Sequence, residues 1–260
     1  MFQGTAYYYA KYRIPYPQKL VDDLRVRTKI TGKGQLLDLA CGTGRVALAL
    51  FPYFNQVWAV DCEPEMITVG SELAKQQRIE NLHWITSKAE ELEVSPESLE
   101  LITIGEAFHR LNQPLIVKRS LEWLIPGYYI ATMGCYGITR GTEPWQVILR
   151  RVIREWTSEK SIANSKNQEQ SIQMRGANYE QKMFEAFGFR DIKTYEFSYP
   201  YTWTLDSIIG NLYSTSNYSK QLLGNKEEFE AQIKSALLTL NLEGYYPQIV
   251  YFYYTLAKKP

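Results

Sequence analysis

Segments of strand character alternate with segments of helix character over residues 35–134, and this alternation constrains the fold more than any other feature. Short apolar runs typical of buried strands lie at 35–40, 56–61, 82–87, 99–105 and 128–134. Helical periodicity lies between them at 45–54, 65–77 and 114–125. Such alternation indicates βαβ crossovers and a mostly parallel sheet with helices on both faces.

The flanking regions extend this pattern and then depart from it. A helix is expected at 17–30, and beyond Gly134 we expect helices at 143–156 and 178–189, a polar stretch at 158–171, and strands at 191–199 and 249–258. The predicted fold class is α/β, with a doubly wound, mostly parallel, seven-stranded sheet whose last strand is antiparallel. We predict one domain over residues 1–260, with a mainly helical cap from insertions at approximately 1–30, 136–175 and 203–246.

The composition and charge of the chain indicate which classes of partner to expect. A formal charge of +1 provides no large field to attract a polyanion, so we expect no nucleic-acid partner. No apolar run approaches the roughly 20 residues of a membrane span, and the start of the chain lacks the apolar core of a secretory signal. Three cysteines and two histidines form no metal-ligand pattern, so we expect reduced thiols, no metal and a cytoplasmic protein. The oligomeric state is left open.

A glycine-rich turn joins the first strand to the helix that follows it. In the segment LLDLACGTG, Gly42 and Gly44 carry no β-carbon, so the backbone from Ala40 onward can approach a ligand closely. Gly42-x-Gly44-x-x-Ala47 also fits the dinucleotide fingerprint, and the glycines alone do not decide the ligand. Asp38 decides it, because a carboxylate four residues before the first glycine would repel a diphosphate and attract an ammonium and a sulfonium.

A second acid ends the next strand. Asp61 follows Gly44 by 17 residues, close to the spacing at which an acid accepts hydrogen bonds from a ribose diol. Cys62 and Met66 beside it could border a base, although core packing explains them equally well.

These residues carry a family resemblance. LLDLACGTG followed by AVDCEPEMI resembles the first two motifs of the S-adenosylmethionine-dependent methyltransferases with a doubly wound, Rossmann-like fold, and the likeness covers about residues 34–135. YRIPYP at 12–17 and AFHRLN at 107–112 are similar to the subgroup of trans-aconitate and secondary-metabolite methyltransferases. The resemblance implies S-adenosylmethionine as cofactor and a methyltransferase activity.

One position departs from the family pattern. Many relatives have an Asp that accepts from the adenine amino group immediately before the position of Ala89, whereas this chain has Lys88, whose ammonium cannot accept a hydrogen bond. The adenine contacts are then expected from the backbone of Ala89, from Met66 or Cys62, or from the carboxylate of Glu90.

The remaining candidates lie in two other segments. His109, just after the fourth strand, could take a proton from the acceptor, and Glu106 in the same loop could orient the substrate or act on the methionine ammonium indirectly. Tyr12 and Arg13 could close over the cofactor, the tyrosine by a cation–π contact and the arginine by gripping a carboxylate. Packing or solvent exposure is the competing interpretation for each of them.

The predicted function is transfer of a methyl group to a small-molecule acceptor, O- or N-directed, by in-line displacement. The alternatives are a nicotinamide-dependent oxidoreductase and a protein that binds S-adenosylmethionine without catalysis. A nucleic-acid amine methyltransferase is disfavoured, because Gly105-Glu106-Ala107-Phe108 stands where such enzymes carry an Asn/Asp-Pro-Pro-aromatic motif.

Overall fold

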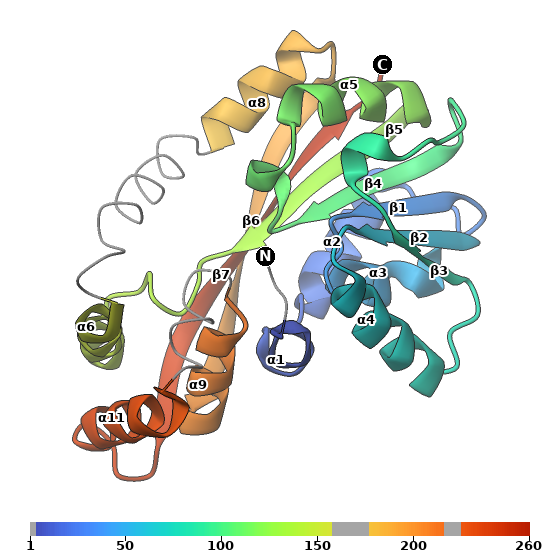
Figure 1. Cartoon of the computed structure of the whole chain (residues 1–260). Helices are drawn as coiled ribbons and strands as arrows, with labels where there is room; N and C mark the ends of the chain where they lie inside the picture. The colour runs from blue at the N-terminus through green and yellow to red at the C-terminus, as the bar shows by residue number, and fades with distance from the viewer. Residues whose placement is uncertain (1–3, 158–176, 216–224) are drawn as a thin grey trace. The chain divides into compact units, whose positions relative to one another are not determined.

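The computed structural model describes residues 4–157, 177–215 and 225–260 (Figure 1). The expected polar stretch at 158–171 lies outside these residues. Seven strands form one sheet in the order β3-β2-β1-β4-β5-β7-β6. The strands are β1 Gln35–Leu39, β2 Gln56–Asp61, β3 Leu82–Thr86, β4 Leu99–Gly105, β5 Leu124–Cys135, β6 Arg190–Thr204 and β7 Tyr245–Lys258.

The helices connect and flank these strands. The α-helices are α1 Ala6–Tyr12, α2 Gln18–Thr28, α3 Arg45–Leu50, α4 Pro64–Gln76, α5 Gln113–Trp123, α6 Pro144–Thr157, α8 Ala177–Ala186, α9 Leu205–Tyr213 and α11 Lys226–Leu238. Short 3-10 turns are η1 Phe51–Tyr53, η2 Ala89–Glu91 and η3 Phe108–Arg110.

Strand directions follow the predicted doubly wound pattern. The pairs β1 with β2, β1 with β4, β2 with β3 and β4 with β5 are all parallel. β7 is antiparallel to β5, because Gly127 N donates to Lys259 O at one end of the pair and Tyr136 N donates to Tyr251 O at the other. The fold class and the antiparallel last strand are therefore confirmed.

The chain divides into two compact units. The larger unit comprises residues 15–134, 175–197 and 252–260, and the smaller comprises 1–14, 135–174 and 198–251. β6 changes unit at residue 198 and β7 at residue 252. Of the three expected cap segments, 136–175 and 203–246 fall almost wholly in the smaller unit, whereas 1–30 is divided between the two units.

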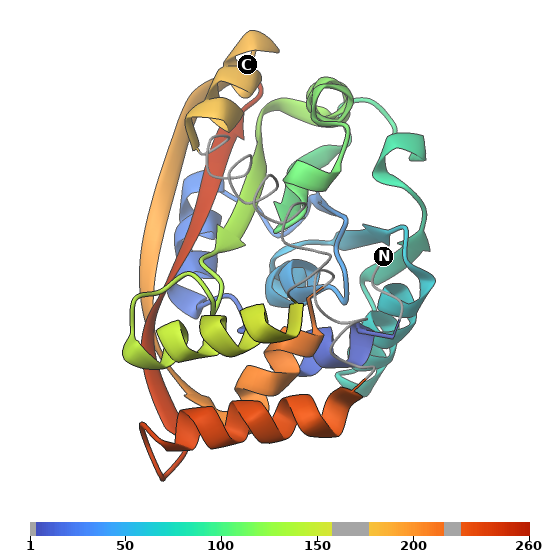
Figure 2. The same ribbon diagram turned by 60° about the vertical axis from the view of Figure 1, so that its left-hand side comes forward.

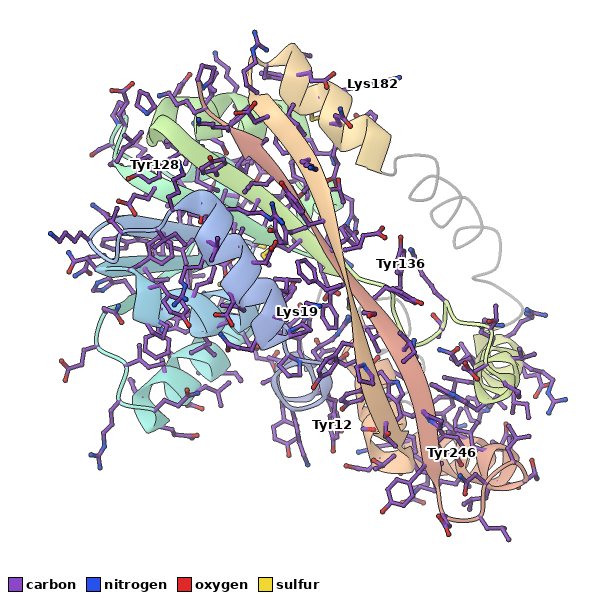
Figure 3. All side chains as sticks on the ribbon, turned by 180° about the vertical axis from the view of Figure 1, so that it is seen from behind. Tyr12, Lys19, Tyr128, Tyr136, Lys182 and Tyr246 are labelled. Carbon is purple, nitrogen blue, oxygen red and sulfur yellow. The ribbon has the colours of Figure 1, made fainter. Side chains whose placement is uncertain are left out.

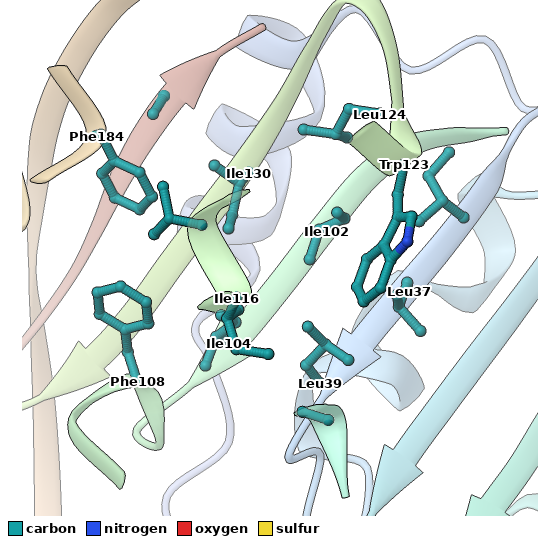
Figure 4. Packing of buried hydrophobic residues seen from close by; sticks show 14 of the residues in the cluster. Leu37, Leu39, Ile102, Ile104, Phe108, Ile116, Trp123, Leu124, Ile130 and Phe184 are labelled. Carbon is teal, nitrogen blue, oxygen red and sulfur yellow. The ribbon is translucent and has the colours of Figure 1, made fainter. Parts of the chain in front are cut away.

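The larger unit is held together by a continuous apolar core on one face of its strands (Figure 4). Leu37 and Leu39 of β1 and Ile102 and Ile104 of β4 point to this face at alternate positions and pack with side chains of α5 and with Phe184 of α8. The intervening residues of β1 point to the opposite face, where Asp38 meets α3. The residues that end β1 and β4 are therefore anchored from both sides of the sheet.

The smaller unit packs its helices against the distal halves of β6 and β7. Helix α11 contacts α6 and α9, and α1 contacts α9 (Figure 2). Trp203 Nε1 donates to Gln248 Oε1 at 2.7 Å and joins the two strands. Trp145 of α6 packs on Tyr246 of β7 with ring centroids 5.7 Å apart (Figure 3 labels Tyr246).

Several element boundaries differ from the expected ones for local reasons. The helix expected over 45–54 ends at Leu50 and continues as η1, because the ring of Pro52 interrupts the hydrogen bonding. β6 and β7 extend to Thr204 and back to Tyr245, beyond the expected 191–199 and 249–258, because these strands continue into the smaller unit. α5 ends at Trp123, and β5 begins at Leu124 with a register shift opposite Leu99 and Leu101.

Candidate functional site

In the turn after β1, three of the five residues from 40 to 44 have a left-handed backbone conformation. Ala40 has φ 51°, Gly42 has φ 58° and Gly44 has φ 80°. Cys41 N donates to Val60 O of β2 at 3.0 Å, and Gly44 N donates to Cys41 O at 2.9 Å. The turn therefore reverses sharply between β1 and α3 while remaining tied to the neighbouring strand.

Asp61 joins this turn to the turn after β2. Its Oδ2 accepts from Gly42 N at 2.8 Å and its Oδ1 accepts from Glu63 N at 2.9 Å. Burial raises the pKa of Asp61, although the hydrogen bonds from Glu63 and Gly42 oppose this shift. The side chain is half-buried, and each carboxylate oxygen can accept a further hydrogen bond. The carboxylate is thus oriented by the protein and can accept from a pair of hydroxyl groups.

Asp38 lies inside the protein. The residue is fully buried, its Oδ1 accepts from Thr103 Oγ1 at 2.8 Å and its Oδ2 accepts from Ala47 N at 3.1 Å. Burial raises the pKa of Asp38 to about 7, and the nearby charge of Asp61 acts in the same direction. Asp38 therefore links β1 to β4 and α3, and both of its oxygens accept hydrogen bonds from within the protein.

Trp84 of β3 is a part of this site that the sequence analysis did not identify. A β-carbon on Gly44 would lie 2.3 Å from Trp84 Cη2, and one on Gly70 of α4 would lie 2.4 Å from the same atom. The space that Gly44 leaves is thus filled by the protein's own indole. No local motif marks Trp84, because it lies 40 residues beyond Gly44 in the chain.

The residues expected near the adenine lie on the β2 and β3 side of the turn. Cys62 is exposed, whereas Met66 and Ala89 are buried. Glu90 Oε1 accepts from Asn112 N at 2.8 Å, so this carboxylate is already used to hold the loop before α5. Lys88 is exposed and pairs with Glu91 at 2.8 Å.

On the other side of β1, Glu106 forms an ion pair with Arg45. The Arg45 Nη1 to Glu106 Oε2 distance is 2.9 Å, and the two side chains are 12% and 17% exposed. Arg45 begins α3 directly after the turn, and Glu106 directly follows β4. Arg45 was not a sequence candidate, because its partner lies 61 residues away and no periodic pattern connects the two. His109 is exposed in η3, whose Phe108 is buried in the core.

Tyr12 and Arg13 belong to the smaller unit and have contacts there. Tyr12 Oη donates to Asp206 Oδ2 at 3.0 Å, and Arg13 Nε donates to Ser214 Oγ at 2.9 Å. These contacts attach the N-terminal segment to α9 and to the residue that follows it.

Among the described residues, no three His, Cys, Asp or Glu side chains gather as metal ligands, and no helix is long and apolar enough to cross a membrane. A surface hollow of about 460 Å³ lies between α2 and η1 and includes Arg25, Lys29 and Tyr53. The hollow is lined by residues within the range 25–32 and by Pro52 and Tyr53 of η1, and none of them belongs to the turn after β1, so the hollow is separate from the site.

Comparison with known proteins identifies the domain. Residues 36–127 match the family described as a methyltransferase domain. A Saccharomyces cerevisiae protein assigned as an S-adenosylmethionine-dependent methyltransferase is 30% identical over 107 residues, which cover 40% of this chain and 36% of that protein. An uncharacterized RNA methyltransferase of Clostridium acetobutylicum is 40% identical over 62 residues, which cover 24% of this chain and 14% of that protein. The chain therefore spans well under half of both curated relatives.

A solved structure extends the likeness to the fold. A protein of Anaeromyxobacter dehalogenans assigned as a type II methyltransferase superposes with a TM-score of 0.63 at 20% identity, covering 94% of this chain and 96% of that one. The TM-score shows a common fold, and the glycine turn of this chain lies within the family match over 36–127. Residues 36–127 thus match a methyltransferase domain, and the chain shares the fold of a solved protein that is assigned as a methyltransferase.

Proposed function

We propose that this chain transfers the methyl group of S-adenosylmethionine to a small-molecule acceptor, at oxygen or nitrogen. The observation that carries the cofactor assignment is the carboxylate of Asp61, which Gly42 N and Glu63 N hold at the edge of the sheet. A carboxylate is an acceptor-only group, and a ribose diol supplies two donors. The residues present therefore fit a nucleoside.

The charges around the turn favour a cationic nucleoside over a dinucleotide. The buried carboxyl of Asp38 and the carboxylates of Asp61 and Glu63 act electrostatically on one another. A pyrophosphate brought to this turn would add negative charge beside them, whereas a sulfonium and an ammonium would relieve their repulsion. These charges favour S-adenosylmethionine over a nicotinamide cofactor.

The methyl donor and the protein contribute different parts of the chemistry. S-adenosylmethionine supplies a methyl group already activated on a sulfonium, so the protein chiefly orients the two reactants and excludes water. His109 would take a proton from an acceptor hydroxyl or amine, which is a task suited to imidazole at neutral pH. A carboxylate acceptor needs no base.

Charge also supports a small-molecule acceptor. Over the whole chain, 29 Lys and Arg oppose 28 Asp and Glu, which leaves little attraction for a polyanion. One relative carries the name of an RNA methyltransferase, so RNA is the competing acceptor in the test below. We place the activity in the cytoplasm, in keeping with the reduced thiols of Cys41 and Cys62.

Isothermal titration with S-adenosylhomocysteine and with NADH tests the cofactor assignment. We expect S-adenosylhomocysteine to bind. Asp61→Asn should raise its dissociation constant roughly ten- to hundredfold, because a charged acceptor is lost. Asp191→Asn is the matched control, since that acid has a 75% exposed side chain in the same unit. Binding of NADH with no response to S-adenosylhomocysteine would overturn the assignment.

The acceptor is tested with methyl-labelled S-adenosylmethionine in a cell extract. We expect the label to appear in the low-molecular-weight fraction. The His109→Ala variant should transfer the label more slowly to a hydroxyl or amine acceptor. Label confined to the RNA fraction contradicts the small-molecule proposal.

A further inference from the structure

The hollow between α2 and η1 has positive charge on its wall. The described residues that line it include Arg25 and Lys29, at the end of α2, and no acid. In the part of the chain that the structure describes, neither of these two side chains forms an ion pair. The carbonyl end of α2 offsets part of the repulsion between the two cations. A bound anion would relieve the rest of that repulsion.

Arg25 is held with one face against an aromatic ring. Its guanidinium Cζ lies 4.6 Å from the centroid of the Tyr53 ring, and the Tyr53 hydroxyl accepts a hydrogen bond from Gln18 Nε2 at 3.5 Å. Stacking occupies the flat face of a guanidinium and leaves the N–H donors at its edge. Within residues 4–157, 177–215 and 225–260, the Arg25 guanidinium donates no hydrogen bond. It therefore presents an oriented fork of donors that fits two oxygens of one anion.

The loop after α2 adds backbone donors. Ile30, Thr31 and Gly32 line the hollow, and their amide N–H groups donate to no acceptor among the described residues. The loop is fixed by Thr31, whose Oγ1 donates to Glu100 Oε1 at 3.0 Å. Glu100 is buried and is not among the described residues that line the hollow. Successive amides without a protein acceptor at a bend of the backbone are a common element of anion sites.

An apolar surface adjoins these donors. Val26 lines the hollow and is 70% exposed, and Pro52 of η1 lines it and is also exposed. A hydrated inorganic ion would leave both side chains in water, whereas an organic group attached to the anion would cover them. The volume of about 460 Å³ lies within the range of small-molecule pockets, which is roughly 300–1,000 Å³.

We infer that this hollow binds a small organic phosphate, with the phosphoryl group on Arg25 and Lys29 and the organic part on Val26 and Pro52. A phosphate monoester carries a charge of about −1.5 to −2 near pH 7, which matches two cations better than the single charge of a carboxylate does. The hollow is separate from the glycine turn, so this site is a second one and does not depend on the proposed function.

Phenyl phosphate, inorganic phosphate and phenol are the probes, and NMR titration of the amide signals of the full chain reports both affinity and place. We expect phenyl phosphate to shift the signals of residues 30–32 and phenol to leave them unchanged. Inorganic phosphate should bind at least about threefold more weakly than phenyl phosphate, because it lacks the apolar contact. The double variant Arg25→Gln, Lys29→Gln should raise the dissociation constant of phenyl phosphate about tenfold or more, because charge-assisted hydrogen bonds are lost.

The double variant Lys75→Gln, Arg78→Gln is the matched control. Lys75 lies in the last turn of α4 and Arg78 follows that helix, both residues are exposed, and their loss changes the net charge by the same amount. This control should change the dissociation constant of phenyl phosphate less than about twofold. Val26→Asp is a further variant that keeps both cations at an exposed position, and the repulsion by its carboxylate should weaken binding as well.

Equal losses in the two double variants would assign the binding to overall charge and overturn the inference. Equal affinities for phenyl phosphate and inorganic phosphate, unchanged signals of residues 30–32, or displacement of phenyl phosphate by S-adenosylhomocysteine would overturn it too. A chain that binds phenyl phosphate in this hollow and binds no S-adenosylhomocysteine would support the inference and overturn the proposed function alone.

Discussion

The indole of Trp84 occupies the space in which a β-carbon on Gly70 would lie, 2.4 Å from two of its ring carbons. The same ring approaches Gly44, so one side chain of β3 packs on the glycine turn after β1 and on α4. The family motif therefore contains a glycine whose small size serves packing within the protein.

Gly70→Ala should destabilise the chain by about 1–3 kcal/mol, because the added methyl group overlaps the indole and must displace it. Urea unfolding measures this difference. In a Trp84→Leu background the cost of Gly70→Ala should be smaller, although the close approach to Thr43 O at 2.9 Å remains and limits the rescue.

Gly137→Ala provides the control for this cycle. A β-carbon there meets no atom within 4 Å, so the substitution should change the free energy of unfolding little. Additive costs for Gly70→Ala and Trp84→Leu would show that the two residues are not in contact.

Asp38 should give the free energy of unfolding a specific pH dependence. Its folded pKa of about 7 lies above the ordinary 3.8, so between these values the folded state holds a proton that the unfolded chain has lost. The contribution of this group is therefore greatest below pH 3.8 and is lost as the pH rises through about 7. The gap between 3.8 and about 7 corresponds to roughly 4 kcal/mol.

Asp38→Asn should remove most of this dependence. The amide stays neutral, its oxygen can accept from Ala47 N, and its NH₂ can donate to the Thr103 hydroxyl. Urea unfolding at pH 5 and pH 8 compares the variant with wild type, and Asp191→Asn serves as an exposed control. An unchanged difference between the two pH values in Asp38→Asn would contradict the assignment.

Tyr254→Phe should destabilise the larger unit by about 1–2 kcal/mol, because a donor to a charged acceptor is lost. Tyr254 Oη donates to Asp23 Oδ2 at 2.5 Å, and Arg27 Nε donates to the same oxygen at 2.7 Å. Burial acts to raise the pKa of Asp23, but the hydrogen bonds from Arg27 and Tyr254 outweigh it, and the pKa lies below its ordinary value.

Thermal unfolding at neutral pH measures this effect. Because the folded pKa of Asp23 is lowered, its contribution is present above pH 3.8 and is lost as the pH falls below that value. Tyr251→Phe is the matched control on the same strand, since Tyr251 is 48% exposed. Equal effects of the two substitutions would argue against a stabilising role for the Asp23 hydrogen bond.

Ser214→Ala should loosen the N-terminal segment of the smaller unit. Ser214 Oγ accepts from Arg13 Nε at 2.9 Å, and a helix of seven residues such as α1 depends on packing for its stability. Amide hydrogen exchange should become faster over residues 6–13, whereas the exposed control Thr239→Ala should leave it unchanged. Exchange unaffected by Ser214→Ala would show that other contacts hold α1.

Much of the domain could be predicted from local pattern. Alternating apolar periodicity located β1 to β5 and the helices between them, because burial on a sheet or helix face imposes a period that is visible in a short window. The glycine turn and Asp61 were also predictable, since a positive φ and a strand-terminal acid are properties of a few consecutive residues.

The contacts that complete the site could not be predicted in this way. Arg45 and Glu106 pair across 61 residues, and Trp84 fills the space of a glycine 40 residues earlier. Neither contact produces a periodic pattern in the sequence. Each depends on the order of the strands in the sheet and on which side chain is long enough to reach its partner. Asp38 illustrates the same limit, since its spacing to Gly42 matches the motif while burial decides which groups it can touch.

By itself, the sequence determined the class of fold, the glycine turn and the acid at the end of β2, because these follow from hydrophobic periodicity and from backbone conformations that few residues adopt. The tertiary structure alone decided which carboxylate is buried, which is held at the edge by an arginine, and which glycine accommodates an indole. Those outcomes depend on distances between segments remote in the chain, and only the packed sheet brings such segments together.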